Sequence, residues 1–200
     1  TLVCTTSLGI TTIATACFSG LDSFPLLAVP FFILAGNLMK FGGLSNKILE
    51  FADALVGHIK GSLGMVAVVA SMFFAALSGS SPATVSAIGS LTIPKMEEEG
   101  YDRAYATALN AAAGTIGVII PPSIPFVIYG VVANCSIADM FKAGILPGVL
   151  IGVVLMIVNY IAVTKNGYGM KNQANKHFSF RKLGKTLKET WLALMVPVII

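Results

Sequence analysis

The sequence predicts an all-α polytopic membrane protein that contains a re-entrant helical hairpin and a discontinuous transmembrane helix. Of the 200 residues, 56% are hydrophobic and only 11% are charged, whereas soluble domains carry about 25% charged residues. Two long stretches, 61–94 and 104–138, contain no charged residue. Each is interrupted near its middle by residues that end helices. Interrupted helices of this kind mark the binding sites of many secondary transporters.

Two apolar runs precede the first charge-free stretch. The run over 2–18 predicts the end of a spanning helix, and a turn is expected near Gly20. The run over 24–39 predicts a second helix, with a kink at Pro30 because proline cannot donate a backbone hydrogen bond. Both runs are expected to lie in the membrane.

The segment 44–60 predicts an amphipathic helix that lies at the membrane surface. Its apolar residues recur at helical spacing on one face, and charged residues occupy the opposite face. The apolar set is Ile48, Leu49, Ala52, Leu55 and Val56, and the charged set is Lys47, Glu50 and Asp53.

The stretch 61–94 is too long for one crossing and too short for two. As a straight helix it would measure about 50 Å, whereas a bilayer core is about 30 Å thick. The break 78–82 reads Ser-Gly-Ser-Ser-Pro, and we expect Ser81 to cap a helix that begins at Pro82. One interpretation is a single kinked helix with a small-residue packing face. We favour a hairpin that enters the membrane, turns at this break and leaves on the same side.

The stretch 104–138 predicts a broken helix over 104–133. Pro121, Pro122 and Pro125 cannot continue an α-helix, because each lacks an N–H donor and its ring clashes with the preceding turn. We therefore expect a first helix from 105 to about 115, an extended crossing, and a second helix from 126 to about 133.

Three further segments complete the chain. An apolar run over 139–164 predicts a continuous spanning helix, and 165–189 is a basic linker. The final residues, 190–200, predict the start of another spanning helix. Because the chain opens and closes inside apolar runs, we expect it to be a piece of a longer protein.

The positions of the basic residues indicate how the chain is oriented in the membrane. If the hairpin returns to its own side, twelve of the thirteen Lys and Arg residues lie on one face of the membrane, with only Lys142 opposite. The positive-inside rule makes that face cytoplasmic. The base of the hairpin and the linker 165–189 are then cytoplasmic, and this asymmetry favours the hairpin. The positive-inside rule also explains the basic composition of the linker better than nucleic-acid binding does.

The two breaks predict a candidate ion site. Serine and threonine hydroxyls and unwound carbonyls are hard oxygen ligands that suit sodium. No carboxylate lies in either stretch, so a cation held by neutral oxygens is favoured over a proton relay. Asn110 could add an amide, or could instead form an interhelical hydrogen bond. The candidate sodium-binding residues are Ser78, Gly79, Ser80, Ser81, Gly114, Thr115, Gly117 and Pro121.

At these residues the chain resembles the large membrane subunit of the TRAP (tripartite ATP-independent periplasmic) transporters. The matching stretches are LDSFPLLAVPFFILAGNLM, FAALSGSSPATVSAIG, IPKMEEEGYDRAYATALNAAAGTIGVIIPPSIPFVIYG and FKAGILPGVL. The resemblance implies an elevator-type, sodium-driven importer of a carboxylate, such as a sialic acid or a C4-dicarboxylate, in a bacterial inner membrane. It also implies two protein partners, an extracytoplasmic binding protein and a small membrane subunit that is separate or fused.

The resemblance also assigns roles by position. Residues 1–60 would belong to the scaffold and 61–138 to half of the transport domain. The breaks at 78–82 and 114–123 would form one sodium site. A second hairpin and a second sodium site would follow Ile200. Sodium is the coupling ion, and no other cofactor is implied. The candidate substrate-binding residues are Ser81, Pro82, Ala83, Asn110, Pro122 and Ser123.

The sequence also bears on two other classes of function. An intramembrane serine protease using Ser80 or Ser81 would need a base, and neither His58 nor His177 lies inside an apolar run. We therefore predict that the chain is not an enzyme. A membrane channel or a scaffold subunit without coupled transport is the alternative to a transporter.

Overall fold

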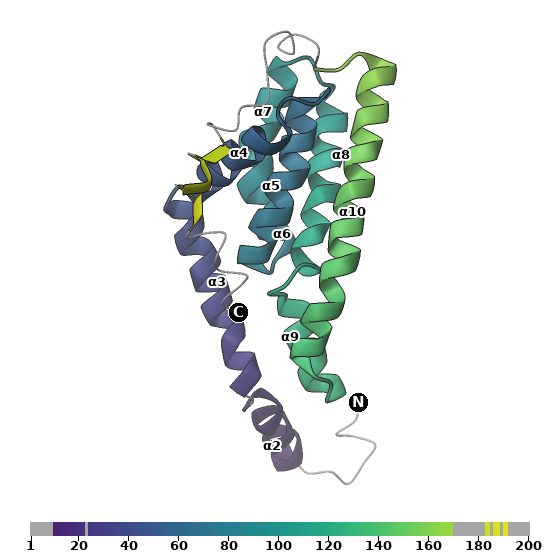
Figure 1. Cartoon of the computed structure of the whole chain (residues 1–200). Helices are drawn as coiled ribbons and strands as arrows, with labels where there is room; N and C mark the ends of the chain where they lie inside the picture. Colours follow the sequence, from purple (N-terminus) through teal and green to yellow (C-terminus); the bar gives the residue numbers. More distant parts are fainter. Residues whose placement is uncertain (1–9, 23, 170–182, 185, 189, 192–200) are drawn as a thin grey trace.

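The computed structural model describes residues 10–22, 24–169, 183–184, 186–188 and 190–191, and these are predominantly helical (Figure 1). The all-α prediction is confirmed. The helices of the first half are α2 (Ile10–Leu21), α3 (Phe24–Phe41), α4 (Leu44–Val56), α5 (Ser62–Ser78) and α6 (Ser81–Thr84). A π-helical turn η1 (Val85–Gly89), α7 (Ser90–Glu98), α8 (Arg103–Gly114), a 3-10 turn η2 (Thr115–Val118), α9 (Ile124–Ala133) and α10 (Ile137–Asn166) follow.

The chain reverses direction at residues 79–80. Gly79 adopts a left-handed conformation with φ of 60°, which glycine reaches without the steric cost of a Cβ. The return arm, formed by α6, η1 and α7, then packs back along α5 (Figure 1). The stretch 61–94 is thus a helical hairpin rather than one kinked helix.

The second charge-free stretch is a broken helix, as its prolines predict. Helix α8 passes into η2, and the backbone is not helical again until α9 begins at Ile124. Helix α9 starts two residues earlier than expected, because Pro125 occupies its first turn, where a missing N–H costs nothing. Ser123 caps this helix by accepting a hydrogen bond from the Phe126 N–H at 3.3 Å.

Helix α4 is the predicted amphipathic helix, although it ends at Val56 rather than at residue 60. Ile48 and Ala52 are buried against α5, while Lys47 and Glu50 are exposed. Helix α3 runs without interruption through Pro30 and contacts both α5 and α9. The predicted run 2–18 is described only from residue 10, where it belongs to α2.

Helix α10 has 30 residues and is the only helix in the described ranges that is long and apolar enough to cross a membrane. It would span about 45 Å at about 1.5 Å per residue. Its small residues Gly144, Gly148 and Gly152 are buried towards the bundle, whereas large side chains such as Leu146 and Ile161 are exposed. Small residues inside and large apolar residues outside are typical of a membrane helix that packs on its neighbours.

The base of the hairpin lies beside the end of α10. The Asn159 amide of α10 donates a 3.2 Å hydrogen bond to the Gly61 carbonyl and accepts one at 3.1 Å from the Tyr105 hydroxyl of α8. The ring of Tyr168, just beyond α10, stacks on Tyr101 with centroids 5.8 Å apart. The starts of α5 and α8 therefore meet the end of α10.

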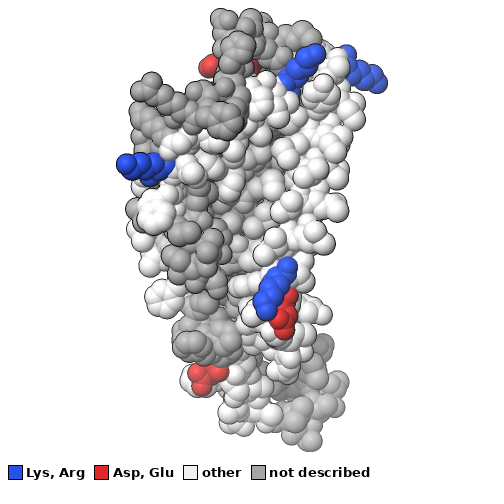
Figure 2. Space-filling view, viewed as in Figure 1, with Lys and Arg blue, Asp and Glu red and all other residues white. Residues whose placement is uncertain are grey.

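This arrangement places basic residues at one end of the bundle. Lys60 precedes α5, Arg103 opens α8 and Lys165 lies in the last turn of α10. Lys142 lies near the opposite end of α10, where it pairs with Asp139 at 3.3 Å. Figure 2 shows most blue side chains of this face towards the upper end and one blue side chain beside a red one in the lower half. The linker residues 170–182, 185 and 189 lie outside the described residues.

The burial of Tyr101, at this end of the bundle, makes the stability of the folded protein depend on pH in the alkaline range. The residue is 4% exposed, and burial raises the pKa of its hydroxyl from 10.0 to about 12. The folded state favours the neutral phenol, so its contribution to stability is complete below pH 10 and is lost as the pH rises towards 12. We expect thermal unfolding between pH 8 and 12 to show a smaller alkaline loss of stability in Tyr101→Phe than in the wild type. Tyr129→Phe, at an exposed position, is the control, and an equal alkaline loss in Tyr101→Phe would contradict the assignment.

Candidate ion and substrate site

The two interruptions touch each other. We call residues 78–82 the tip and residues 114–123 the break. The N–H of Ile124, the residue directly after the break, donates a 3.3 Å hydrogen bond to the Gly79 carbonyl. A Cβ at Gly79 would lie 2.6 Å from the Pro122 carbonyl oxygen, so only glycine fits there. The prediction that these distant segments lie close together is confirmed.

A second contact joins the tip to the centre of the break. A Cβ at Gly117 would lie 2.7 Å from the Thr84 hydroxyl oxygen and 2.9 Å from the Ser80 carbonyl oxygen. Such distances are shorter than van der Waals contact allows, and the Ser80 carbonyl belongs to backbone that cannot easily move. Gly117 therefore allows the break to approach the oxygen atoms of the tip. Gly114 plays a similar part against the side chain of Val85.

Three oxygen atoms cluster at this contact. The hydroxyls of Ser78 and Thr84 are 3.0 Å apart and both are buried, at 2% and 0% exposure. The Ser80 carbonyl accepts hydrogen bonds from the Thr84 hydroxyl at 2.9 Å and from the Ser78 hydroxyl at 3.3 Å. This cluster of neutral oxygens forms the core of the candidate site.

Thr84 was missed by the sequence interpretation. It lies two residues beyond the tip, and its spacing of four from Ser80 was the available signal, since a threonine hydroxyl on a helix often bonds the carbonyl four residues earlier. The prediction that Ser81 caps a helix beginning at Pro82 was wrong. The structure begins α6 at Ser81, with Ser80 as an N-cap whose side chain makes no capping hydrogen bond. The helix starts one residue earlier than predicted because both Ser81 and Pro82 fit its first turn.

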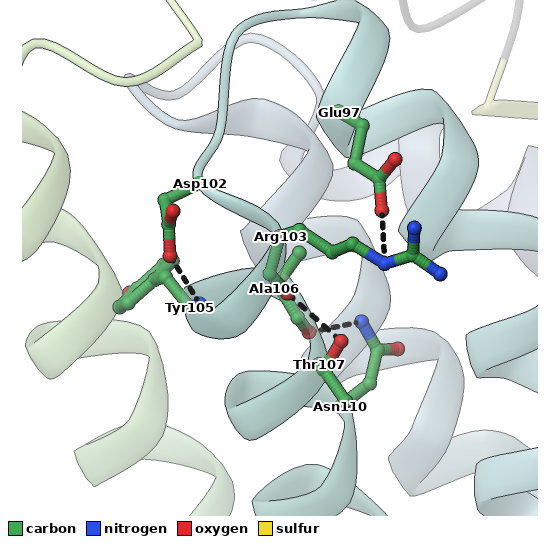
Figure 3. Close-up of polar contacts among 7 residues, drawn as sticks. All are labelled: Glu97, Asp102, Arg103, Tyr105, Ala106, Thr107 and Asn110. Atoms are coloured by element: carbon green, nitrogen blue, oxygen red, sulfur yellow. Dashed lines mark hydrogen bonds and ion pairs between the residues drawn. The ribbon is translucent and has the colours of Figure 1, made fainter.

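Asn110 lies away from the tip. Its amide oxygen accepts a 2.7 Å hydrogen bond from Thr92 of α7, and its nitrogen donates to the Ala106 carbonyl at 2.9 Å. Figure 3 shows the second contact on α8, next to the Arg103–Glu97 ion pair near the start of that helix. The oxygen and the nitrogen of the Asn110 amide thus both have hydrogen-bond partners, which favours the interhelical hydrogen bond over a role in substrate binding.

The hydroxyls of the break bond to nearby backbone. Thr115 is exposed and donates to the Ala112 carbonyl at 2.7 Å, and buried Ser123 donates to the Val118 carbonyl at 2.7 Å. Pro121 is half-buried and Pro122 is buried. The break therefore contributes backbone oxygens and close packing rather than spare hydroxyls.

Helix α3 closes another side of the tip. Its Gly36 would place a Cβ 3.5 Å from the Cα of Ser78. A cavity of about 60 Å³ lies between α3 and the tip, large enough for an ion and a few waters. Its lining residues are Ile33, Gly36, Asn37, Ser78, Ser80 and Ala83. Asn37 is a further polar residue that the sequence interpretation did not select.

The chemistry of these groups suits a small monovalent cation. Hydroxyl and carbonyl oxygens are hard ligands, and no Asp or Glu lies within 61–94 or 104–138. Among the described residues, no three His, Cys, Asp or Glu side chains come close enough to hold a metal ion. The donor set therefore fits sodium better than a transition metal.

The Thr84 hydroxyl can be tested with an isosteric change. Thr84→Val removes one hydroxyl from the cluster, and a hydrogen bond of about 1 kcal/mol corresponds to about a fivefold loss of affinity. We expect the sodium concentration for half-maximal uptake to rise by about that factor. Thr107→Val is the control, because Thr107 makes the same bond to a carbonyl four residues earlier but is exposed on α8. Equal sodium dependence in the two variants would exclude Thr84 from the site.

An apolar helix long enough to span a membrane accompanies a helical hairpin and a broken helix whose interruptions touch each other, and interrupted helices that meet in this way are typical of membrane transport proteins. The chain belongs to the family described as "Tripartite ATP-independent periplasmic transporter, DctM component", which it matches over residues 1–200. The resemblance noted in the sequence is thereby confirmed.

Curated relatives support this membership. The chain is 47% identical to the isethionate TRAP transporter permease protein DctMQ of Oleidesulfovibrio alaskensis, over 100% of this chain and 31% of the relative. It is 45% identical to the sialic acid TRAP transporter large permease protein SiaM of Vibrio cholerae, over 100% of this chain and 46% of the relative. It is 42% identical to the C4-dicarboxylate TRAP transporter large permease protein DctM of Pseudomonas aeruginosa, over 92% of this chain and 42% of the relative. The chain spans less than half the length of these relatives.

Proposed function

We propose that this chain forms part of a permease that uses a sodium gradient to import an organic acid across a bacterial inner membrane. The named substrates of the three relatives, isethionate, sialic acid and C4-dicarboxylates, are all organic anions. Sialic acid and C4-dicarboxylates are carboxylates, and we propose a carboxylate as the substrate here. The permease would work by an elevator mechanism, in which the hairpin and the broken helix move together.

The contact between tip and break is the observation that carries this proposal. It brings the hydroxyls of Ser78 and Thr84 and the Ser80 carbonyl next to Gly117, in a region without formal charge. A cation bound there would supply the positive charge that a carboxylate needs, since no Lys or Arg lies in either charge-free stretch. Coupling follows if the substrate binds well only when sodium is present.

Membership of the family supports a proposal for the location and the partners. We propose that the hairpin is re-entrant from the cytoplasmic side, because Lys60, Arg103 and Lys165 lie at its base. The word tripartite implies two other components, for which we propose a small membrane subunit and an extracytoplasmic binding protein that delivers the substrate.

Uptake into proteoliposomes tests this function. The full-length permease with its small subunit and binding protein is reconstituted, and a labelled carboxylate is offered with and without an inward sodium gradient. We expect saturable uptake that requires sodium. Uptake that is the same with and without the sodium gradient would reject sodium coupling. Uptake that is neither saturable nor driven by a gradient would favour a channel or scaffold.

A further inference from the structure

A second cavity lies at the basic end of the bundle, away from the tip. It has a volume of about 390 Å³, within the range of about 300–1,000 Å³ that is usual for ligand pockets. It opens between α4, the start of α5 and the end of α7. The lining residues are Asn46, Leu49, Glu50, Asp53, Leu63, Val66, Thr92 and Lys95.

The lining combines three kinds of group. Leu49, Leu63 and Val66 provide an apolar side. The carboxylates of Glu50 and Asp53 and the ammonium of Lys95 provide both signs of charge. In the described part of the chain, Glu50 and Lys95 are exposed and neither is in an ion pair. The cavity therefore offers a negative group and a positive group that remain available to a ligand with both charges.

We propose that this cavity binds the headgroup of phosphatidylethanolamine. The lipid ammonium would lie against Glu50 and Asp53, and the phosphate would lie against Lys95 and the Asn46 amide. The acyl chains would leave along the apolar side formed by Leu49, Leu63 and Val66. The site rests on the membrane location proposed above, because α4 is amphipathic and would lie at the cytoplasmic surface, where phospholipid headgroups are found.

The charges of the cavity discriminate between headgroups. Phosphatidylglycerol has no ammonium, so Glu50 and Asp53 would face its uncharged glycerol and would gain no compensating positive group. Phosphatidylcholine carries a quaternary ammonium, which has no N–H donors and is bound best by aromatic side chains, and none of the eight described lining residues is aromatic. A primary ammonium can donate hydrogen bonds to carboxylates, and such charge-assisted bonds are strong. The cavity thus fits ethanolamine better than choline or glycerol.

Native mass spectrometry of the purified full-length permease tests the proposal. The protein is incubated with equal amounts of phosphatidylethanolamine, phosphatidylcholine and phosphatidylglycerol, without sodium or substrate, and the retained lipid is measured. We expect phosphatidylethanolamine to be retained about tenfold more than the other two, and Glu50→Gln to remove this preference, since hydrogen bonds to charged groups are worth about one order of magnitude in affinity. Lys95→Gln should lower retention of phosphatidylethanolamine as well.

Two controls keep the result interpretable. Glu98→Gln changes an exposed carboxylate on α7 that does not line the cavity, so it should retain lipid as the wild type does. Glycerophosphoethanolamine, which has no acyl chains, should compete only weakly. Equal retention of the three lipids, or equal effects of Glu50→Gln and Glu98→Gln, would overturn the proposal. Tight binding of the chain-free compound would show a site for a soluble amine instead. Because sodium and substrate are absent, these outcomes are independent of the uptake experiment.

Discussion

Gly117→Ala is expected to lower the sodium affinity of the permease about tenfold or more and to reduce sodium-driven uptake accordingly. The new Cβ would lie 2.7 Å from the Thr84 hydroxyl oxygen and 2.9 Å from the Ser80 carbonyl oxygen. The tip and the break must then separate by several tenths of an ångström, and a change of 1.4 kcal/mol at the site already corresponds to a factor of ten. Sodium-dependent uptake into proteoliposomes measures the effect.

The matched control for this change is Gly20→Ala. Gly20 lies in α2, and no atom outside its immediate surroundings would lie within 4 Å of a Cβ there. It adds the same methyl group without a collision, so uptake should match the wild type. Both variants should reach the membrane in equal amounts, because neither adds charge. Sodium affinity that is unchanged in Gly117→Ala would mean that the tip and break need not touch during transport.

Asn159→Leu is expected to destabilise the permease by about 1 kcal/mol, the usual net contribution of one hydrogen bond, because the donor, Tyr105, is half-buried. The Tyr105 hydroxyl loses its bond to the Asn159 amide oxygen. The Gly61 carbonyl keeps a partner, because it also accepts a hydrogen bond from the Met65 N–H at 3.1 Å. Unfolding in mild detergent, followed by circular dichroism, measures the loss.

A second substitution separates this cause from a general packing defect. In Asn159→Leu/Tyr105→Phe the orphaned hydroxyl is removed, so part of the lost stability should return. Asn166→Leu makes the same change at an exposed position at the end of α10 and should have little effect. If the double variant is no more stable than Asn159→Leu, the hydrogen bond to Tyr105 is not the source of the stability.

Composition and helix breakers were sufficient to predict the fold class and the two interruptions. The absence of charge over 61–94 and 104–138 required burial away from water, and Gly79 and the three prolines dictated where regular helix must stop. The face of α4 could also be predicted, because its apolar residues recur at helical spacing. These features are local or periodic, and a single sequence displays them directly.

The exact partners at the site could not be predicted in the same way. Thr84 joins Ser78 and Ser80 only because the return arm starts one residue before Pro82 and turns its fourth residue inward. The engagement of Asn110 by Thr92 depends on how α7 packs on α8. The approach of α3 to Ser78 depends on a contact between residues more than forty positions apart. The last two are tertiary contacts without a local signal, whereas the spacing of four between Ser80 and Thr84 was a local one.

Calorimetric titration of sodium into the purified full-length permease tests the central claim, that neutral oxygens at the tip and break hold the coupling ion. We expect the wild type to give a saturable sodium isotherm in sodium-free buffer. Ser78→Ala/Ser81→Ala, which removes two hydroxyls from the tip and leaves membrane insertion intact, should weaken that isotherm. A wild type that binds no sodium, or a double variant that binds it with unchanged affinity, would contradict the account.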